Sequence, residues 1–335
     1  MTLFTILSLA ALFAAPAQGG SARIYVSNEA SGDVSIIQND AVVSRIAVGK
    51  RPRGLRLSPD GARLYVAVSG SPRTGPGQDD SRVGPPDRAA DGIAVVDLRS
   101  SSVVTRLPGG TDPESFDVTP DGTRLFISNE DAASVSVVDI AQAKVIGSVP
   151  VGAEPEGVTA RPDGRVVYVT SEESDEVTAI DAGSFAVLAR IKTAARPRGI
   201  VFTPDGQRAF VSCEQGGAVE VIDAKAHRHI RRIHIEETGA KPMGLARSPD
   251  GARVYVTTGR GGSIAVLDAA TGRVTARFPN VGARPWGIGV SGDGKLLYTA
   301  NGPSDDVSVV DASTGKVLRR IPSGGSPWGI AVAHH

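Results

Sequence analysis

Residues 155–199 read PEGVTARPDGRVVYVTSEESDEVTAIDAGSFAVLARIKTAARPRG and contain the repeat unit that decides the fold. The unit opens with Pro-x-Gly and turns at the Pro-Asp-Gly of 162–164, where proline presets φ and glycine accepts a positive φ. Short runs of β-forming residues flank this turn, and two more follow the polar residues 172–175 and the turn at 182–183. The unit is therefore predicted to form four short antiparallel strands.

Seven copies of this unit follow one another along the chain. Their Pro-x-Gly signposts begin at Pro52, Pro113, Pro155, Pro197, Pro242, Pro285 and Pro327, with Ser115 in place of the glycine in the second copy. A four-strand repeat of about 40–45 residues is typical of a β-propeller blade. The sequence thus predicts an all-β, seven-bladed propeller of four-stranded antiparallel blades.

The phase of the repeat predicts how the ring closes. The chain enters the propeller at a second strand, residues 22–28, and ends on a first strand, residues 329–332. One blade is then built from N-terminal strands and a C-terminal strand, which leaves no open edge in the ring. We expect one propeller domain over residues 22–335.

Residues 1–17 resemble a secretory signal peptide. The apolar run is short for a bilayer span, and the Ala-Pro-Ala at 15–17 fits a small-x-small cleavage site, although no basic residue precedes Arg23. No later run is long and apolar enough to cross a membrane. We expect a periplasmic or secreted bacterial protein with no membrane span in the mature chain.

Composition narrows the class of partner. The 335 residues carry 36 basic and 36 acidic side chains, so nothing indicates a nucleic-acid ligand. The single cysteine, Cys213, permits no intrachain disulfide and is expected to be buried and inert.

An excursion of about 20 residues, 72–91, interrupts the second copy; it is either a functional loop or a neutral insertion.

The residues that flank each Pro-x-Gly proline form a non-random ring of charge. Since glycine is expected where strands crowd the axis, these flanks should surround the mouth of the central channel. Arginine forks and tryptophan faces can bind an anionic, planar or carbohydrate-like group. Alternatively, the acidic and basic flanks pair with each other and the tryptophans fill gaps between blades. The predicted rim contains Arg51, Arg53, Asp112, Glu114, Glu154, Glu156, Arg196, Arg198, Lys241, Arg284, Trp286 and Trp328.

A second acidic series, Glu29, Glu130, Glu172 and Glu214, ends the second strands of four copies. Four carboxylates suit Ca²⁺, but they belong to separate blades, so convergence on one ion is difficult. Hydrogen bonds that stabilise the loops are the preferred interpretation. Neither a metal nor another cofactor is expected.

Recognisable catalytic motifs are absent from the sequence. There is no Cys-x-x-Cys-His, Gly-x-Ser-x-Gly, His-Glu-x-x-His or phosphate-binding loop. His227 and His229 fall at a predicted turn on the other face, and His234 is expected to be an exposed side chain late on an outer strand. These observations favour a binding protein over an enzyme.

The repeats YVSNE, YVTSEE and YVTTG, together with PDG and VSVVD, resemble the YVTN-type β-propeller repeat over essentially all of the mature chain. More narrowly, KRPRG, DPESFDVTPDG, RPRGIVFTPDGQRAFVSCEQGG, NGPSDDVSVVD and SPWGIAV resemble secreted propellers associated with PQQ-dependent alcohol catabolism. The resemblance implies a seven-bladed periplasmic protein found beside quinoprotein dehydrogenases and cytochromes c. It implies no particular reaction.

Three functions follow from these observations. The favoured one is a non-enzymatic accessory propeller that serves PQQ-dependent alcohol oxidation. It would dock a quinoprotein dehydrogenase, a cytochrome c or a small ligand at the predicted rim. The alternative is a metal-dependent lactonase- or lyase-like enzyme, with Asp112, Glu114, Glu154 and Glu156 as ligands or bases. The least favoured is a PQQ-binding redox enzyme, because the chain is shorter than quinoprotein dehydrogenases.

Overall fold

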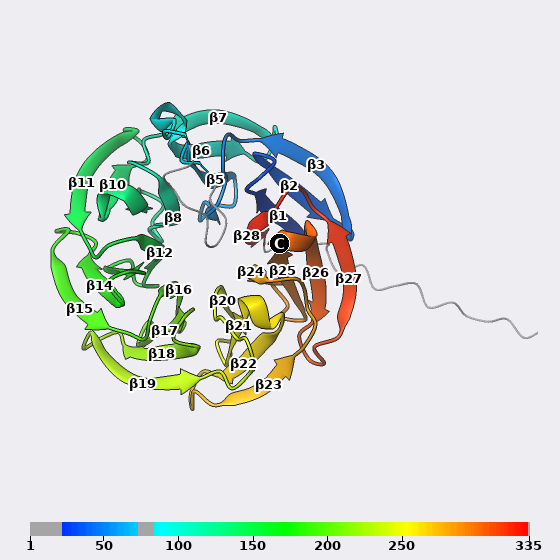
Figure 1. Ribbon diagram of the computed structural model, residues 1–335. Helices are drawn as coiled ribbons and strands as arrows, with labels where there is room; N and C mark the ends of the chain where they lie inside the picture. The colour runs from blue at the N-terminus through cyan, green and yellow to red at the C-terminus, as the bar shows by residue number, and fades with distance from the viewer. Residues whose placement is uncertain (1–21, 73–83, 334–335) are drawn as a thin grey trace, which may run out of the picture.

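The computed structural model describes residues 22–72 and 84–333, and these residues form a closed ring of seven four-stranded sheets (Figure 1). From the axis outward, blade 1 contains β28 (Pro327–Ala333), β1 (Arg23–Asn28), β2 (Asp33–Gln38) and β3 (Ala41–Ala47). Blade 2 contains β4 (Leu55–Leu57), β5 (Arg63–Val68), β6 (Gly92–Asp97) and β7 (Ser102–Leu107), and blade 3 contains β8 (Pro113–Val118), β9 (Arg124–Asn129), β10 (Ser134–Asp139) and β11 (Lys144–Pro150). The predicted seven-bladed propeller is confirmed.

The remaining blades repeat this order. Blade 4 contains β12 (Pro155–Ala160), β13 (Val166–Ser171), β14 (Glu176–Asp181) and β15 (Val187–Lys192), and blade 5 contains β16 (Pro197–Phe202), β17 (Arg208–Cys213), β18 (Ala218–Asp223) and β19 (Arg228–His234). Blade 6 contains β20 (Leu245–Arg247), β21 (Arg253–Thr257), β22 (Ile264–Asp268) and β23 (Val274–Phe278), and blade 7 contains β24 (Pro285–Val290), β25 (Leu296–Asn301), β26 (Asp306–Asp311) and β27 (Val317–Pro322). Short 3-10 helices are η2 (Arg88–Ala90), η3 (Glu130–Ala132), η4 (Gly259–Gly261) and η5 (Gly302–Ser304).

Ring closure follows the prediction from the repeat phase. β28, from the C-terminal end, pairs antiparallel with β1, with Ile24 opposite Val332 and Tyr25 opposite Ala331. The predicted signal segment, residues 1–17, lies outside the described residues, as do residues 73–83 of the predicted excursion. In the described part of the chain, no helix has the length and apolar character needed to cross a membrane.

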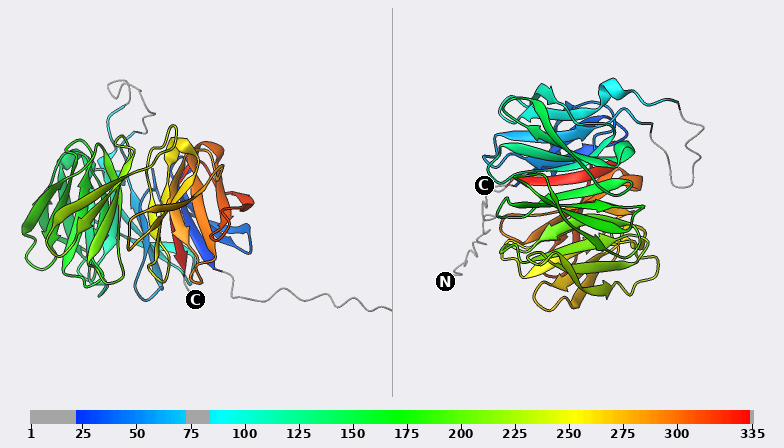
Figure 2. Two further views of the ribbon diagram at one scale, coloured as in Figure 1. Left: turned by 90° about the horizontal axis from the view of Figure 1, so that it is seen from below. Right: turned by 90° about the vertical axis from the view of Figure 1, so that its left-hand side faces the viewer.

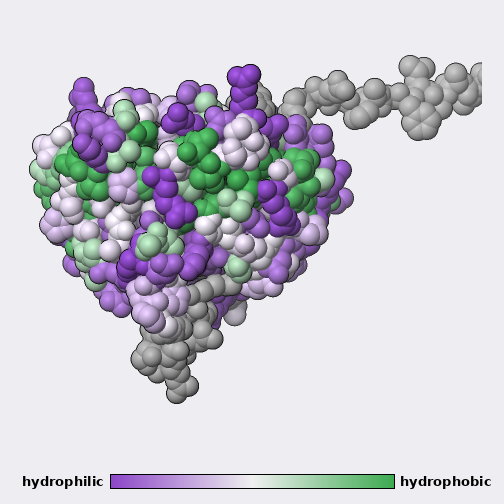
Figure 3. Space-filling model, turned by 90° about the horizontal axis from the view of Figure 1, so that it is seen from above, coloured by the Kyte–Doolittle hydropathy of each residue, from purple (hydrophilic) through white to green (hydrophobic). Residues whose placement is uncertain are grey.

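The core is divided among the junctions between blades. In one such cluster, Tyr168 and Val177 of blade 4 pack against Phe202 and Val211 of blade 5. The outer strands contribute little to the core and expose apolar side chains, such as Val43 of β3. Figure 3 shows such side chains gathered along the outer wall of the disc. The outer wall therefore combines these exposed apolar side chains with charged ones, such as those of β19.

The glycine of Pro-x-Gly is required because each inner strand touches the next one. A Cβ on Gly157 would lie 2.1 Å from the carbonyl oxygen of Arg198, on the inner strand of the neighbouring blade. Thr170 joins the same two blades, since its hydroxyl donates to that carbonyl at 2.7 Å and accepts the Gly157 N–H at 2.8 Å. Equivalent hydroxyls on the second strands of four other blades donate to the next blade's carbonyl: Ser27, Ser128, Ser212 and Thr257. The prediction that the Pro-x-Gly strand is innermost is confirmed.

The two faces of the disc differ in character. On one face, the Pro-Asp-Gly turns are uniform: Gly164 has φ +70°, and Asp163 accepts the N–H of Arg165 at 3.1 Å. The opposite face carries the connections between blades and the short 3-10 helices, and Figure 2 shows η4, in yellow, at the face opposite the end of β28. The variable residues of the repeat therefore gather around one mouth of the channel.

Candidate active site at the channel mouth

A cavity of about 1110 Å³ occupies this mouth. Ten of the twelve predicted rim residues line it, whereas Asp112 and Glu154 do not. Sequence reasoning did not place Glu29, Glu130, Glu172, Glu214, Arg260 and Asp305 on the rim, although all of them line this cavity. A narrower space of about 120 Å³, bordered by inner-strand glycines, shares Glu156, Arg198, Trp286 and Trp328 with it.

The backbone of each connection aims the rim side chains. The residue before the proline has a left-handed φ in six of the seven connections, for example 49° at Glu154 and 56° at Arg196. Its carbonyl accepts the N–H of the residue that ends the second strand, as in Glu172 to Glu154 at 2.9 Å and Glu214 to Arg196 at 2.7 Å. Non-glycine residues persist in this region of φ only where the surroundings enforce it. The connections are thus held rigidly around the cavity.

The hydrogen bonds and ion pairs of the second acidic series correct the interpretation that its members only stabilise loops. The N–H groups of Glu29, Glu130, Glu172 and Glu214 do stabilise the loops, but their carboxylates bind the rim arginines. Their recurrence one residue after a second strand was the available signal. This signal was missed because each glutamate and the blade connection beside it are far apart in the sequence.

Blades 4 and 5 contain one network of these buried ion pairs. The Arg198 guanidinium, 11% exposed, donates to Glu156 at 2.6 Å and to Glu214 at 2.7 and 2.9 Å, and it also contacts Glu172. Burial alone would lower the pKa of Arg198, but the carboxylates of Glu156 and Glu214 outweigh it and raise that pKa. Arg196 donates to Glu172 at 2.7 Å and lies 4.0 Å from Glu154. The predicted pairing of neighbouring acidic and basic flanks is therefore present.

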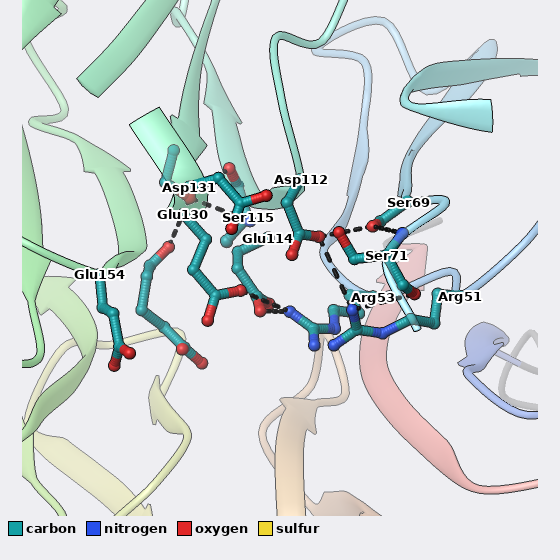
Figure 4. A network of polar contacts seen from close by, with 12 residues as sticks. Arg51, Arg53, Ser69, Ser71, Asp112, Glu114, Ser115, Glu130, Asp131 and Glu154 are labelled. Atoms are coloured by element: carbon teal, nitrogen blue, oxygen red, sulfur yellow. Dashed lines mark hydrogen bonds and ion pairs between the residues drawn. The ribbon is translucent and has the colours of Figure 1, made fainter. Parts of the chain in front are cut away.

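A similar network joins blades 1, 2 and 3 (Figure 4). The Arg53 guanidinium contacts Glu114, and it lies 3.2 Å from Glu29 and 3.5 Å from Glu130. Arg51 lies 3.2 Å from Glu29 and 3.7 Å from Asp112, whose carboxylate also accepts the Ser69 hydroxyl at 2.5 Å. We call the four arginines and their carboxylates the paired sector: Arg51, Arg53, Arg196, Arg198, Glu29, Asp112, Glu114, Glu130, Glu154, Glu156, Glu172 and Glu214.

Glu130 differs from the other carboxylates of the paired sector. It is the first residue of η3, its side chain is 30% exposed, and it faces the cavity (Figure 4). Burial raises its pKa to about 8, helped by the nearby carboxylates of Asp112 and Glu156 and opposed by the Arg51 guanidinium. Glu130 can therefore exchange a proton near neutral pH.

Two further features belong to this acidic side of the mouth. Burial and the carboxylates of Glu173 and Glu130 also raise the pKa of Glu154, against the effect of Arg196. Arg88 of η2 forms an ion pair with Asp131 of η3, next to Glu130. The described end of the predicted 72–91 loop thus holds the turn that carries Glu130.

The opposite side of the mouth is cationic and aromatic. The rings of Trp286 and Trp328 lie 5.8 Å apart at 34°, and the Arg284 guanidinium lies 4.9 Å from the centre of the Trp286 ring. Burial lowers the pKa of Arg284, Glu214 opposes this shift, and Arg260 and Arg198 reinforce it. We call Lys241, Arg260, Arg284, Trp286 and Trp328 the cationic sector. The tryptophans border the cavity and do not merely fill gaps between blades.

The cysteine and histidine side chains of the described residues contribute little to the site at the channel mouth. Cys213 is buried, and burial followed by the Glu220 carboxylate raises its pKa to about 12, as expected for an inert thiol. His229 contacts Glu220 at 2.7 Å on blade 5, and neither residue lines the mouth cavity. Among residues 22–72 and 84–333, no group of three or more His, Cys, Asp or Glu is arranged to hold a metal ion.

The fold and the charged mouth define a seven-bladed β-propeller with a candidate site at one end of its channel. Residues 77–164 and 161–335 match the model of the YNCE-like β-propeller family, and the chain belongs to that family. The narrower resemblance to PQQ-associated propellers stays a prediction. A comparison with curated proteins finds no significant match.

Solved structures share the fold. A periplasmic gluconolactonase of Pseudomonas aeruginosa has a TM-score of 0.74 at 20% identity, covering 94% of this chain and 99% of its own. A Bacteroides uniformis protein provisionally assigned as a 6-phosphogluconolactonase has a TM-score of 0.75 at 17% identity, covering 93% and 99%. Kuenenia stuttgartiensis hydrazine synthase has a TM-score of 0.70 at 22% identity, covering 85% and 95%.

At these identities the likenesses establish the fold alone. Even so, the names of the two lactonases contradict our prediction of a non-enzymatic accessory to PQQ-dependent oxidation. The prediction was wrong because it rested on the absence of short linear motifs, whereas a propeller assembles its mouth from residues dispersed over all blades.

Proposed function

We propose that this protein is a lactonase-like enzyme that hydrolyses a sugar lactone in the mouth cavity. The observation that carries the proposal is Glu130, a cavity-facing carboxyl group whose pKa is raised to about 8. A general base works best when its pKa lies near the operating pH. The lactone as substrate is suggested by the names of two proteins with the same fold.

The proposed step uses one water molecule. The Glu130 carboxylate takes a proton from water while the water oxygen attacks the lactone carbonyl, forming a tetrahedral oxyanion. The ring C–O bond then breaks, and the protonated Glu130 returns its proton to the departing ring oxygen. The product is the open-chain hydroxy acid, and Glu130 regains its starting form.

The arginines of the paired sector supply the electrostatic part of this step. Arg196 is the most exposed of them at 37%, so its guanidinium is the one best placed to face an oxyanion in the cavity. Arg53 lies 3.5 Å from Glu130 and favours the ionised form that must be present before the proton of water is taken up. Glu154, with its own raised pKa, is the second candidate base; it lies outside the cavity lining but 4.0 Å from Arg196, which is part of that lining.

The test is hydrolysis of a panel of sugar lactones by the mature protein, followed by titration of the released acid. Glu130→Gln should lower the rate at least about 100-fold, the lower end of the range for a general base. The matched control is Glu236→Gln, an exposed glutamate outside the cavity lining, which should keep full activity. Unchanged hydrolysis by Glu130→Gln, with loss only in Glu154→Gln, would transfer the role to Glu154.

Metal dependence is decided in the same assay. Each lactone is tested after treatment with EDTA and again after addition of Mg²⁺, Ca²⁺, Mn²⁺ or Zn²⁺. Activity that survives chelation supports the step written above. Activity that requires an added ion would replace it with the metal-dependent form of the alternative.

We further propose that the protein acts in the periplasm, on the basis of the signal-like residues 1–17. Fractionation of the producing cells and N-terminal sequencing of the mature chain test this directly. A mature N-terminus shortly after Ala17 in the periplasmic fraction would support export. Full-length protein in the cytoplasm would contradict it.

A further inference from the structure

The cations of the mouth fall into two groups with different surroundings. The four arginines of the paired sector each have a carboxylate oxygen within 4.0 Å. Among residues 22–72 and 84–333, no ion pair within that distance involves Lys241, Arg260 or Arg284, and the carboxylates of Glu214 and Glu29 act on Arg284 only from farther away. The nearest part of blade 7 offers Asp305, but its carboxylate accepts the backbone N–H of Ser326 at 2.7 Å. The positive charge of the cationic sector is therefore not neutralised by ion pairs with carboxylates of the described residues.

Within the described residues, the side chain of Arg284 makes a cation–π contact and no ion pair within 4.0 Å. Its guanidinium carbon lies 4.9 Å from the centre of the Trp286 ring, and such a contact consumes none of the N–H donors. Its left-handed φ of 49° fixes the direction in which the side chain leaves the backbone. A planar fork held in this way fits the paired oxygens of a carboxylate or phosphate.

Arg260 and Lys241 are positioned together beside it. Lys241 donates its backbone N–H to the carbonyl of Thr258 at 2.8 Å, directly before η4, which carries Arg260. The preceding Gly259 packs so closely that a Cβ there would lie 2.7 Å from the Lys241 carbonyl oxygen. Arg260 is near enough to Arg284 for their like charges to repel and to lower the Arg284 pKa. A bound anion would relieve this repulsion.

We propose that the cationic sector binds an anionic group of the substrate, a phosphate or a carboxylate, while Trp286 and Trp328 pack against its sugar ring. This proposal rests on the proposed function and narrows it to an acidic sugar lactone. The anionic end lies on blades 6 and 7, and the lactone ring reaches toward Glu130 on blade 3. The cavity of about 1110 Å³ is ample for a ligand of this size.

The first experiment measures anion binding without catalysis. The chain has two tryptophans, and both belong to the cationic sector, so tryptophan fluorescence reports on this site and on Arg198, which lies 5.3 Å from the centre of the Trp286 ring. Inorganic phosphate, sulfate and chloride are titrated at constant ionic strength. Phosphate should change the fluorescence saturably, and Arg284→Gln and Arg260→Gln should each raise the midpoint at least about tenfold. Arg99→Gln, on an exposed turn outside the cavity lining, should leave it unchanged.

Equal midpoints in wild type, Arg284→Gln and Arg260→Gln would overturn the proposal, as would a response that never saturates. Circular dichroism confirms that each variant is folded, and the exposed Arg260 provides an independent variant should Arg284→Gln misfold. Calorimetric titration with phosphate provides a second readout, because Arg284→Gln also changes the surroundings of Trp286.

The second experiment compares a neutral aldonolactone with a phosphorylated and a carboxylated one. Arg284→Gln should raise KM for the acidic lactone at least about tenfold more than KM for the neutral lactone, and the preferred acidic lactone identifies the anion. Equal use of neutral and acidic lactones by wild type would overturn the inference and keep the proposed function. Saturable phosphate binding without hydrolysis of any lactone would overturn the proposed function and support the anion site.

Discussion

The paired sector and the cationic sector both draw on residues that flank the Pro-x-Gly prolines, and they differ in how their charges are neutralised. In the paired sector, Arg51 and Arg196, which precede the proline, form ion pairs with carboxylates. In the cationic sector, Arg284 has the same place before its proline, but it lies over Trp286 and near another cation, Arg260 of η4. The residue before the proline therefore serves two purposes: it joins blades where acids flank it, and it offers charge to a ligand where they do not.

The largest expected effect separates the two sectors by stability. Arg198→Met leaves Glu156 buried without its cation and leaves Glu172 and Glu214 with Arg196 alone, which should lower the unfolding free energy by about 3–5 kcal/mol. Arg284→Met removes a cation that has no such partners and should cost less than about 1 kcal/mol. Urea unfolding of both variants measures the difference. Equal losses would show that the two sectors do not differ in this way.

The next effect is a pH dependence that belongs to the paired sector. The folded-state pKa of Glu130 is raised from 4.5 to about 8, so the native state binds more protons than the unfolded chain between these values. The unfolding free energy should therefore fall as pH rises through this window, and the contribution is present in full only below it. One unit corresponds to about 1.4 kcal/mol, so a few kcal/mol are expected.

Glu130→Gln should flatten that part of the pH profile, measured by urea unfolding between pH 5 and pH 9. The same variant removes the base, so the rise of the hydrolysis rate through about pH 8 should disappear with it. Arg284→Gln should keep both profiles of the wild type. A slope that persists in Glu130→Gln would assign the titration to another carboxyl group.

A smaller effect tests whether equivalent hydrogen bonds between blades support both sectors. Thr170→Val and Thr257→Val each remove the hydroxyl that joins one blade to the carbonyl of the next, at Arg198 and at Trp286. Each should cost about 1–3 kcal/mol, because the carbonyl loses this donor and the N–H of Gly157 or Gly244 loses its hydroxyl acceptor. Thr178→Val is the control, since its buried hydroxyl has no hydrogen-bond partner among the described residues. If the first two variants differ in thermal unfolding, part of the difference between the two sectors comes from the hydrogen bonds that join their blades.

The smallest effect on stability is that of salt. Raising NaCl from about 0.05 to about 0.5 M shortens the screening length severalfold, which weakens exposed electrostatic contacts more than buried ones. Phosphate binding at the cationic sector should weaken several-fold, whereas the unfolding free energy should change by less than about 1 kcal/mol. Phosphate titration and urea unfolding at both salt concentrations check this. Salt-independent phosphate binding would argue against an electrostatic site.

The sequence by itself determined the fold, the number of blades and the ring closure. Each is encoded locally: Pro-x-Gly marks an inner strand because Gly157 has no room for a Cβ, and Pro-Asp-Gly fixes the next turn through Gly164. The predicted rim was also local in origin, since its residues flank the same prolines. Most of that rim lies where the repeat phase placed it.

Only the tertiary structure decided which of these charges are neutralised. Glu172 and Arg198 are 26 residues apart, yet they meet because neighbouring blades bring their connections to one mouth. The raised pKa of Glu130 depends first on burial and then on the carboxylates of Asp112, in the connection before β8, and Glu156 of β12. Arg260 was overlooked because its place beside Arg284 follows from the packing of η4 on the connection that carries Lys241. Electrostatic character depends on distance through space, and the sequence orders residues only along the chain.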